Sequence, residues 1–339
     1  IGFETKSGEV TITPGKTANL DFEIAQGVGL SEVVILGSRG APRTKLETMV
    51  PVDVIGAQEI ENSSQASLSQ ILQYVAPSFH STPQTISDGT DHIDPAALRG
   101  LGPDQTLVLI NGKRRHTSAL LNVNGTVGRG SVGTDLNAIP ASAIERIEIL
   151  RDGAAAQYGS DAIAGVINIV LKKNTNTVSF DVQAGVTSPN AFDGPANAAG
   201  NVPDSLIPEF NADGEMYKIG SNFGFDVGDE GGYVNVTLEY TDKASTNRSG
   251  NYTGSIYPAG YDDALSEADF FALVQNETGF LERQVMEIGN SAIRNAGAFL
   301  NAAYPLSNNA ELYGSLGFNY KNGIARGFYR FPGSQDRVV

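Results

Sequence analysis

The stretch VSFDVQAGV at residues 178–186 decides the fold, because apolar and polar side chains alternate along it. Alternation with a period of two places Val178, Phe180 and Val182 on one face of a β-strand and polar side chains on the other. Later stretches repeat the pattern with apolar positions at Tyr217, Ile219, Phe223, Phe225 and Val227; at Val234, Val236, Leu238 and Tyr240; at Ala298, Leu300, Ala302 and Tyr304; and at Leu312, Leu316, Phe318 and Tyr320. Strands of about ten residues with one apolar and one polar face are typical of a transmembrane β-barrel.

The lengths of the connections support the same prediction. About 27 residues separate the first two strands and about 50 separate the third from the fourth, whereas Gly228–Gly232 and Pro305–Asn309 make short connections. Long and short connections alternate in a barrel with one rim outside the cell and one in the periplasm. A soluble β-sandwich does not require long and short connections to alternate, so the sequence favours a barrel.

Composition excludes several other classes of protein. The chain has 38 acidic and 23 basic side chains and a net charge of -15, which argues against nucleic acid as a partner. It has no Cys, and therefore no disulfide framework, no thiolate zinc site and no cysteine nucleophile. The longest apolar run, Ala162–Leu171, is shorter than the roughly 18 residues of a transmembrane helix. A membrane location therefore requires β-strands.

The first half of the chain divides into three parts. Residues 1–26 alternate and turn, as in the final hairpin of a small β-sandwich. Residues 27–50 form a Gly-rich linker that contains one apolar strand, residues 32–36, which needs a partner to avoid aggregation. Residues 51–173 read as a compact α/β unit, followed by the barrel strands at 174–339. Since the chain opens at Ile1 without Met, we expect it to be processed or cut.

Helix and strand signals are clear in the compact unit. We expect a helix that Ser67 caps and Pro77 ends, with Leu68, Ile71, Leu72 and Val75 on its buried face. A short helical turn follows Pro140. The expected strands are Val52–Ile55, Leu107–Ile110, Arg146–Leu150 and Val166–Val170.

Two polar loops are the candidate sites. Asp88, Asp91, His92 and Asp94 could hold a hard cation, although such runs are more often solvated loops, and we expect no metal. Residues 113–116, the densest basic run, form either a solvated or ion-paired surface or a contact with an anionic or polar ligand. Asn122, Asn124 and Arg129 extend this Gly-rich loop. With three His and no nucleophile elbow, the chain shows little sign of an enzyme, and we expect no catalytic residue and no cofactor.

Several ordered motifs reveal a resemblance to a known family. They are Leu98-Arg99-Gly100, LVLING at 107–112, Ile139-Pro140 with AIERIE at 143–148, YGS at 158–160 and GVINI at 165–169. Together they resemble the plug domain of TonB-dependent outer-membrane receptors. The resemblance implies an α+β plug domain inside a transmembrane antiparallel β-barrel of about 22 strands. Because only five strands are present, we expect this chain to be the N-terminal part of a longer receptor.

The resemblance also implies a function. Such receptors import a scarce solute across the outer membrane of a Gram-negative bacterium, with energy from TonB and its inner-membrane complex. The expected partners are TonB, outer-membrane lipid, and a siderophore, peptide, glycan or other small molecule. Glu32, Val33, Val34, Ile35 and Leu36 are similar to the TonB box, and residues 1–26 to the end of a carboxypeptidase-regulatory-like domain. The alternative is a surface ligand-binding or adhesion β-protein without active transport. The spacing argues against a SusC-like lipoprotein partnership.

The resemblance assigns two sets of plug residues. The loops at 80–95 and 113–134 would face outside and contact the ligand. Their candidate residues are Asp91, His92, Arg114, Arg115, His116, Asn122, Asn124 and Arg129. A second set, formed by Arg99, Glu145, Arg146 and Arg151, would pair charges within the plug or with the barrel wall and so act as a lock rather than as catalysts.

Overall fold

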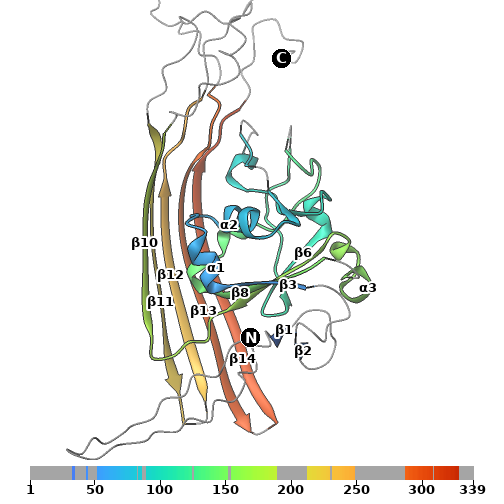
Figure 1. Cartoon of the computed structure of the whole chain (residues 1–339), viewed down its shortest axis with the longest axis vertical. Helices are drawn as coiled ribbons and strands as arrows, with labels where there is room; N and C mark the ends of the chain where they lie inside the picture. Colours follow the sequence, from blue (N-terminus) through green and yellow to red (C-terminus); the bar gives the residue numbers. More distant parts are fainter. Residues whose placement is uncertain are drawn as a thin grey trace, which may run out of the picture.

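The computed structural model describes two parts that lie side by side: a sheet of long strands and an α+β domain packed against one face of it (Figure 1). The described residues are 33–34, 43–44, 52–81, 83–85, 89–123, 126–151, 154–188, 212–229, 231–248, 287–307 and 309–327. The sandwich hairpin expected at residues 1–26 and the side chain of Asn124 lie outside them. No helix in these ranges is both long and apolar enough to cross a bilayer.

The long strands form the meander that the alternation predicts. They pair antiparallel in chain order. They are β10 (Val178–Thr187), β11 (Asp213–Val227), β12 (Gly232–Lys243), β13 (Ala292–Ser307) and β14 (Ala310–Ile324). The connections are long between β10 and β11 and between β12 and β13, and short at 228–231 and 308–309. We therefore distinguish a long-connection rim from a short-connection rim.

The two faces of this sheet differ as predicted. Phe180 is 77% exposed and Leu316 is 70% exposed on the outer face, whereas Asn222 and Thr237 are buried between the sheet and the α+β domain. The register fixes this, since Ile219 pairs with Tyr240 on the outer face and a slip by one residue would turn every side chain to the opposite face. Among the described strands, β10 and β14 each pair on one side only, and lipid offers no hydrogen bonds to the other side.

The α+β domain is built on a second, smaller sheet in the order β3-β8-β9-β6-β7, with β6 and β9 parallel and the other pairs antiparallel. Its strands are β3 (Val52–Gly56), β6 (Thr106–Ile110), β7 (Lys113–Arg114), β8 (Ile144–Leu150) and β9 (Gly165–Leu171). All of β9 is buried. This explains why its sequence is an apolar run, interrupted only by Asn168, rather than an alternating one.

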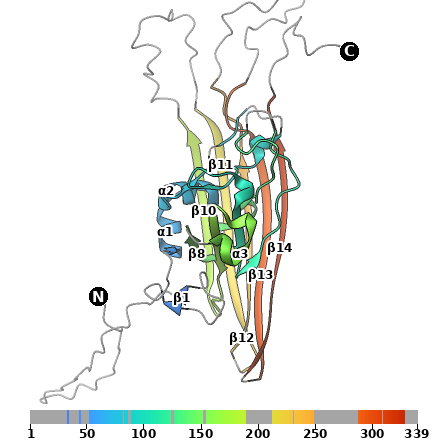
Figure 2. The ribbon, with the colours of Figure 1, turned by 90° about the vertical axis from the view of Figure 1, so that its right-hand side faces the viewer.

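Helices and short pieces complete the domain (Figure 2). The helices are α1 (Ala57–Asn62), α2 (Leu68–Val75) and α3 (Ala154–Tyr158), of which only α2 was predicted. The 3-10 turns are Thr90–His92, Pro103–Gln105, Leu136–Ala138, Ala141–Ala143 and Ser160–Ala162. The two-residue strands are β4 (Phe79–His80) with β5 (Ala97–Leu98), and β1 (Val33–Val34) with β2 (Arg43–Thr44).

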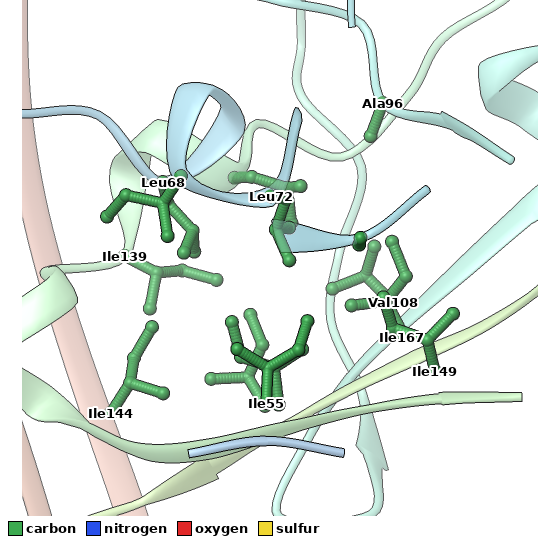
Figure 3. Packing of buried hydrophobic residues seen from close by; sticks show 14 of the residues in the cluster. Ile55, Leu68, Leu72, Ala96, Val108, Ile139, Ile144, Ile149 and Ile167 are labelled. Carbon is green, nitrogen blue, oxygen red and sulfur yellow. The ribbon is translucent and has the colours of Figure 1, made fainter. Parts of the chain in front are cut away.

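The core lies between α2 and the smaller sheet. Figure 3 shows Leu68 and Leu72 of the helix facing Ile55 and Ile144. Leu68, Ile71 and Leu72 are at most 2% exposed, and Val75 packs at the edge. This confirms the predicted apolar face. Ser67 is the N-cap residue as expected, but its hydroxyl donates to the Gln70 side chain at 2.8 Å instead of accepting from the helix backbone.

Candidate functional site

Asparagine amides make several of the hydrogen bonds at the seam between the α+β domain and the long strands. Asn235 donates to the Asn174 carbonyl at 2.9 Å, and Asn301 donates to the Lys172 carbonyl at 3.0 Å. Asn111 in turn donates to the Asn301 side chain at 3.1 Å. It stands in the predicted Asn-Gly turn with a φ of +48°. Because an amide both donates and accepts, one side chain can satisfy a carbonyl and a second amide across the seam.

The smaller sheet contains a fully buried polar pair. Glu148 and Asn168 are both 0% exposed. Asn168 donates to Glu148 at 3.0 Å and accepts from the backbone N–H of Gly112 at 2.9 Å. Arg146 completes the group with a 3.0 Å bond to Glu148. Neither buried residue was predicted as a site residue, although a polar residue inside an apolar run was a visible signal for Asn168.

Asp91 joins the first polar loop to the long-connection rim. It is 5% exposed and accepts from Ser291 Oγ at 3.0 Å and from the Arg326 N–H at 3.0 Å. The Gly89 N–H adds a bond at 3.2 Å. Burial raises the pKa of Asp91, but these hydrogen bonds outweigh it and lower the pKa below its usual value. The carboxylate proposed as a ligand contact is thus already engaged with residues that flank β13 and β14.

His92 and Lys321 lie next to this junction. The His92 ring packs on Gly323 of β14 so closely that an added Cβ there would lie 2.5 Å from Nδ1. Burial is the largest effect on the pKa of His92 and lowers it. Asp91 raises this pKa and Lys321 lowers it further. The net shift is downward, which favours the neutral ring at pH 7. Lys321 forms an ion pair with Asp135 and donates to the His92 carbonyl at 3.4 Å. The ion pair between Lys321 and Asp135 therefore joins β14 to the α+β domain.

The basic run at residues 113–116 begins near the short-connection rim of the long strands. Lys113 is 5.6 Å from the centroid of the Tyr313 ring, which is near the start of β14 at the short-connection rim. Arg114 forms an ion pair with Asp161, and Arg115 stacks 5.8 Å from the centroid of the Phe299 ring. The tight turn after β6 folds β7 back beside β6, so the basic run begins directly after this turn. Lys113 thus lies near the short-connection rim, and Arg114 is an ion-paired surface residue.

The two polar loops meet at an apex that includes Asn122 and Arg129. Thr90 and Thr126 bond through their hydroxyls, and the Gly130 N–H donates to the Asn122 carbonyl at 2.8 Å. The Asn122 side chain is buried, and its Nδ2 has no partner among the described residues. Arg129 is exposed at this apex. Burial, and then the adjacent Arg115, lower the pKa of His116.

Two apolar residues at the apex escaped the sequence analysis. Leu121 is 48% exposed and Val127 is 39% exposed beside Arg129. The sequence feature that could have identified them is an apolar residue in a Gly-rich polar loop without strand or helix periodicity. The apex therefore offers an apolar and a cationic surface together.

The charged set forms pairs inside the domain. Arg146 contacts Glu148 at 3.0 Å and Glu145 at 3.3 Å. Arg151 contacts Asp53 at 3.0 Å and thereby ties the segment after β8 to β3. Arg99 donates to the Arg151 carbonyl at 2.6 Å. The ion pairs of this set thus join plug residues to one another. No group of three His, Cys, Asp or Glu suited to a metal ion occurs within the described ranges.

A small α+β domain packed against the polar face of a meander, whose other face is apolar, is the arrangement of a plug domain beside part of a β-barrel. Residues 44–166 match the family model described as "TonB-dependent Receptor Plug Domain", so this part of the chain is such a plug domain. The Vibrio vulnificus vitamin B12 transporter BtuB is 29% identical over 252 residues, which are 72% of this chain and 37% of the transporter. The Acinetobacter baumannii probable TonB-dependent siderophore receptor PirA is 40% identical over 114 residues, which are 33% of this chain and 15% of that receptor.

Solved structures agree on the fold. The ferric enterobactin receptor PfeA of Pseudomonas aeruginosa superimposes with a TM-score of 0.55 at 22% identity, over 80% of this chain and 33% of that chain. The PirA receptor of Acinetobacter baumannii gives a TM-score of 0.52 at 20% identity, over 82% of this chain and 32% of that chain. The chain thus spans about a third or less of these receptors. Together the matches support a TonB-dependent receptor, a class of Gram-negative outer-membrane protein.

Proposed function

We propose that the receptor that carries this chain imports a scarce solute across the outer membrane with energy from TonB and its inner-membrane complex. One observation supports this most strongly: the plug lies against the polar face of the strands through amide bonds, such as those from Asn301 to Lys172 and from Asn295 to Asn137, while the apolar face points away. A domain in that position obstructs the lumen of a barrel. Solute passage then requires the plug to rearrange, and the outer membrane has no nucleotide to drive this.

We propose the segment from Glu32 to Leu36 as the contact for TonB. Val33–Val34 forms β1 and pairs with β2 along one edge. A strand so placed can accept a TonB strand along its other edge by β-augmentation. Val34→Pro removes a backbone donor, whereas Val34→Ile keeps the donor and serves as the matched control. We expect Val34→Pro to abolish uptake and leave ligand binding intact.

The substrate contacts are proposed at the apex of the plug. Arg129, Leu121 and Val127 are exposed there, with Asn122 and His116 nearby in the same loop. A cation beside apolar side chains suits an anionic or polyhydroxylated solute with an apolar part. Siderophores and vitamin B12, which the names of the relatives mention, are the first probes, and peptides and glycans stay open. Arg129→Gln should weaken binding, whereas Arg114→Gln should leave it unchanged because Arg114 pairs with Asp161 near the lower edge.

The other assignments remain proposals of the same kind. We keep the division into residues 1–26, 27–50, 51–173 and 174–339, with a carboxypeptidase-regulatory-like end at 1–26. The protein is proposed to be a transporter rather than an enzyme, as the names of its relatives suggest. The alternative is a surface binding or adhesion protein. Uptake that survives deletion of residues 32–36 would favour that alternative.

A further inference from the structure

A cavity of about 300 Å³ lies in the seam, beside the start of α2 and near the long-connection rim of the strands. The plug forms one wall of this cavity, and the inner faces of β10 to β14 form the other. The apex residues Leu121, Val127 and Arg129 are not among its described lining residues, so the cavity is distinct from the apex. Its volume is at the lower end of the roughly 300–1,000 Å³ typical of small-molecule sites. The cavity therefore suits a small solute.

Most of the charged groups that line this cavity are already paired. Glu239 Oε2 is 3.2 Å from Lys218 Nζ, and Lys321 forms the ion pair with Asp135 described above. Asp91 accepts its three hydrogen bonds at the junction with the strands. These groups have no charge left to offer to a ligand.

Lys243 and Asp94 are different. The ammonium group of Lys243 has no hydrogen bond and no ion pair within the part of the chain that the structure describes. Asp94 Oδ2 accepts from Ser69 Oγ at 2.8 Å and from Asn137 Nδ2 at 3.1 Å, whereas Oδ1 accepts no bond from the described residues. Both residues are partly exposed. Asp94 is near enough for its charge to act on Lys243, yet the two form no ion pair, so a cation and an anion face the same cavity with a gap between them.

We propose that this cavity binds a small zwitterion, an amino acid or a short peptide, with its carboxylate on Lys243 and its ammonium group on Asp94 Oδ1. A charged group that is partly removed from water needs a partner of opposite charge, and such a ligand supplies one to each residue. A purely anionic solute would leave Asp94 unpaired, and a purely cationic one would leave Lys243 unpaired. The hydroxyl of Thr241 on the same wall can bond to the peptide group of the ligand.

This inference goes beyond the proposed function. It concerns binding in the seam and requires neither TonB nor transport. Binding of a zwitterion can therefore fail while the importer proposal stands, and a receptor without TonB-dependent uptake can still bind the zwitterion.

Calorimetric titration of the receptor with its complete barrel tests both contacts. The probe is L-alanyl-L-alanine. Its N-acetyl derivative lacks the ammonium group, and its C-terminal amide lacks the carboxylate. A hydrogen bond between charged groups changes affinity roughly tenfold or more. We therefore expect the wild-type receptor to bind the dipeptide roughly tenfold or more tightly than either derivative.

Two variants assign the contacts to their residues. Lys243→Met removes the cation and nearly keeps the length of the side chain, so it should bind the dipeptide and the amide equally while still disfavouring the N-acetyl derivative. Asp94→Asn should show the reverse preference. Lys243→Arg keeps the positive charge and should keep the preference for a free carboxylate. A general loosening of the plug does not produce this crossed pattern.

A matched control lies next to Lys243 in the sequence. Asp242 belongs to the opposite face of β12, where it forms a 3.0 Å ion pair with Arg294, so Asp242→Asn should bind all three ligands like wild type. No binding of millimolar dipeptide to the wild-type receptor would overturn the proposal, as would equal losses for all three ligands in both cavity variants. Binding that is lost in Arg129→Gln but kept in Lys243→Met would place the dipeptide at the apex and would also overturn it.

A second measurement leaves both charges in place. Because this chain has no cysteine, Thr241→Cys introduces one thiol on the cavity wall, and Asp242→Cys places one on the opposite face of the same strand. A ligand in a pocket of this size covers most of the wall that it contacts. We expect saturating dipeptide to slow modification by a charged methanethiosulfonate reagent roughly tenfold at position 241 and to leave the rate at position 242 unchanged. Equal rates at position 241 with and without dipeptide would exclude this cavity as its site.

Discussion

Removal of the Asp91 carboxylate should release the apex of the plug from the strands. Asp91→Ala removes the bonds from Ser291, Arg326 and Gly89 and leaves three donors unsatisfied, of which the Ser291 hydroxyl is buried. A hydrogen bond to a charged group contributes about 1.5–3 kcal/mol. Since the three bonds share one carboxylate and are not additive, we take about 3 kcal/mol for the junction. At about 1.4 kcal/mol per factor of ten, local opening should become roughly 100-fold more frequent.

Hydrogen exchange measures this opening. The reporters are the Arg326 amide, which donates to Asp91, and the Ile93 amide, which donates to Thr90. Ser291→Ala removes one donor only and should raise exchange about tenfold, for a loss of about 1.5 kcal/mol. Asp104→Asn changes an exposed acid of the same domain and serves as the control. The reasoning is refuted if Asp91→Ala leaves exchange at residues 89–96 unchanged, or if Asp104→Asn raises it equally.

Three further predictions follow from single contacts. The junction at Asp91 should hold at neutral pH and open as pH falls below about 4. The reason is that the pKa of Asp91 is lower in the folded protein than in the unfolded chain, so the stabilisation is lost only when the carboxylate is protonated. Faster exchange already near pH 7 in the same measurement would contradict this. Leu72→Ala, in the core and 0% exposed, should cost about 2–5 kcal/mol in the free energy of unfolding. Denaturant titration checks it, with Tyr74→Ala, 74% exposed, expected to change stability little. Gly323→Ala should displace the His92 ring and raise exchange near residue 92, whereas Gly314→Ala, with open space at its Cβ, should not.

Much of the fold was predictable because each part is a local pattern. The alternation at residues 178–186 and the parity of the connections predicted the strands, their faces and their order. The helix from Leu68 to Val75 followed from its spacing. The short helices α1 and α3 escaped because six and five residues carry too little periodicity to distinguish them from loops.

The candidate site was predicted less well, because it depends on which residues meet across long sequence distances. Asp91 was noticed as a polar loop residue, but its bond to Ser291, 200 positions away, has no local signal. The ion pair of Arg114 with Asp161, 47 positions away, has no local signal either. The Lys218–Glu239 pair lies on two inner strand faces, where each residue alone looks like an ordinary polar position.

The central claim is that the plug obstructs a barrel which TonB opens, and parallel assays of binding and uptake test it most directly. Cells that express the receptor, with or without TonB, are given iron-loaded enterobactin and labelled cyanocobalamin as probes. Surface-bound and internalised label are counted separately, alongside the Val34→Pro and Val34→Ile variants. The account predicts equal binding in all strains, with uptake only where both TonB and an intact β1 backbone are present. Uptake that persists without TonB would contradict it.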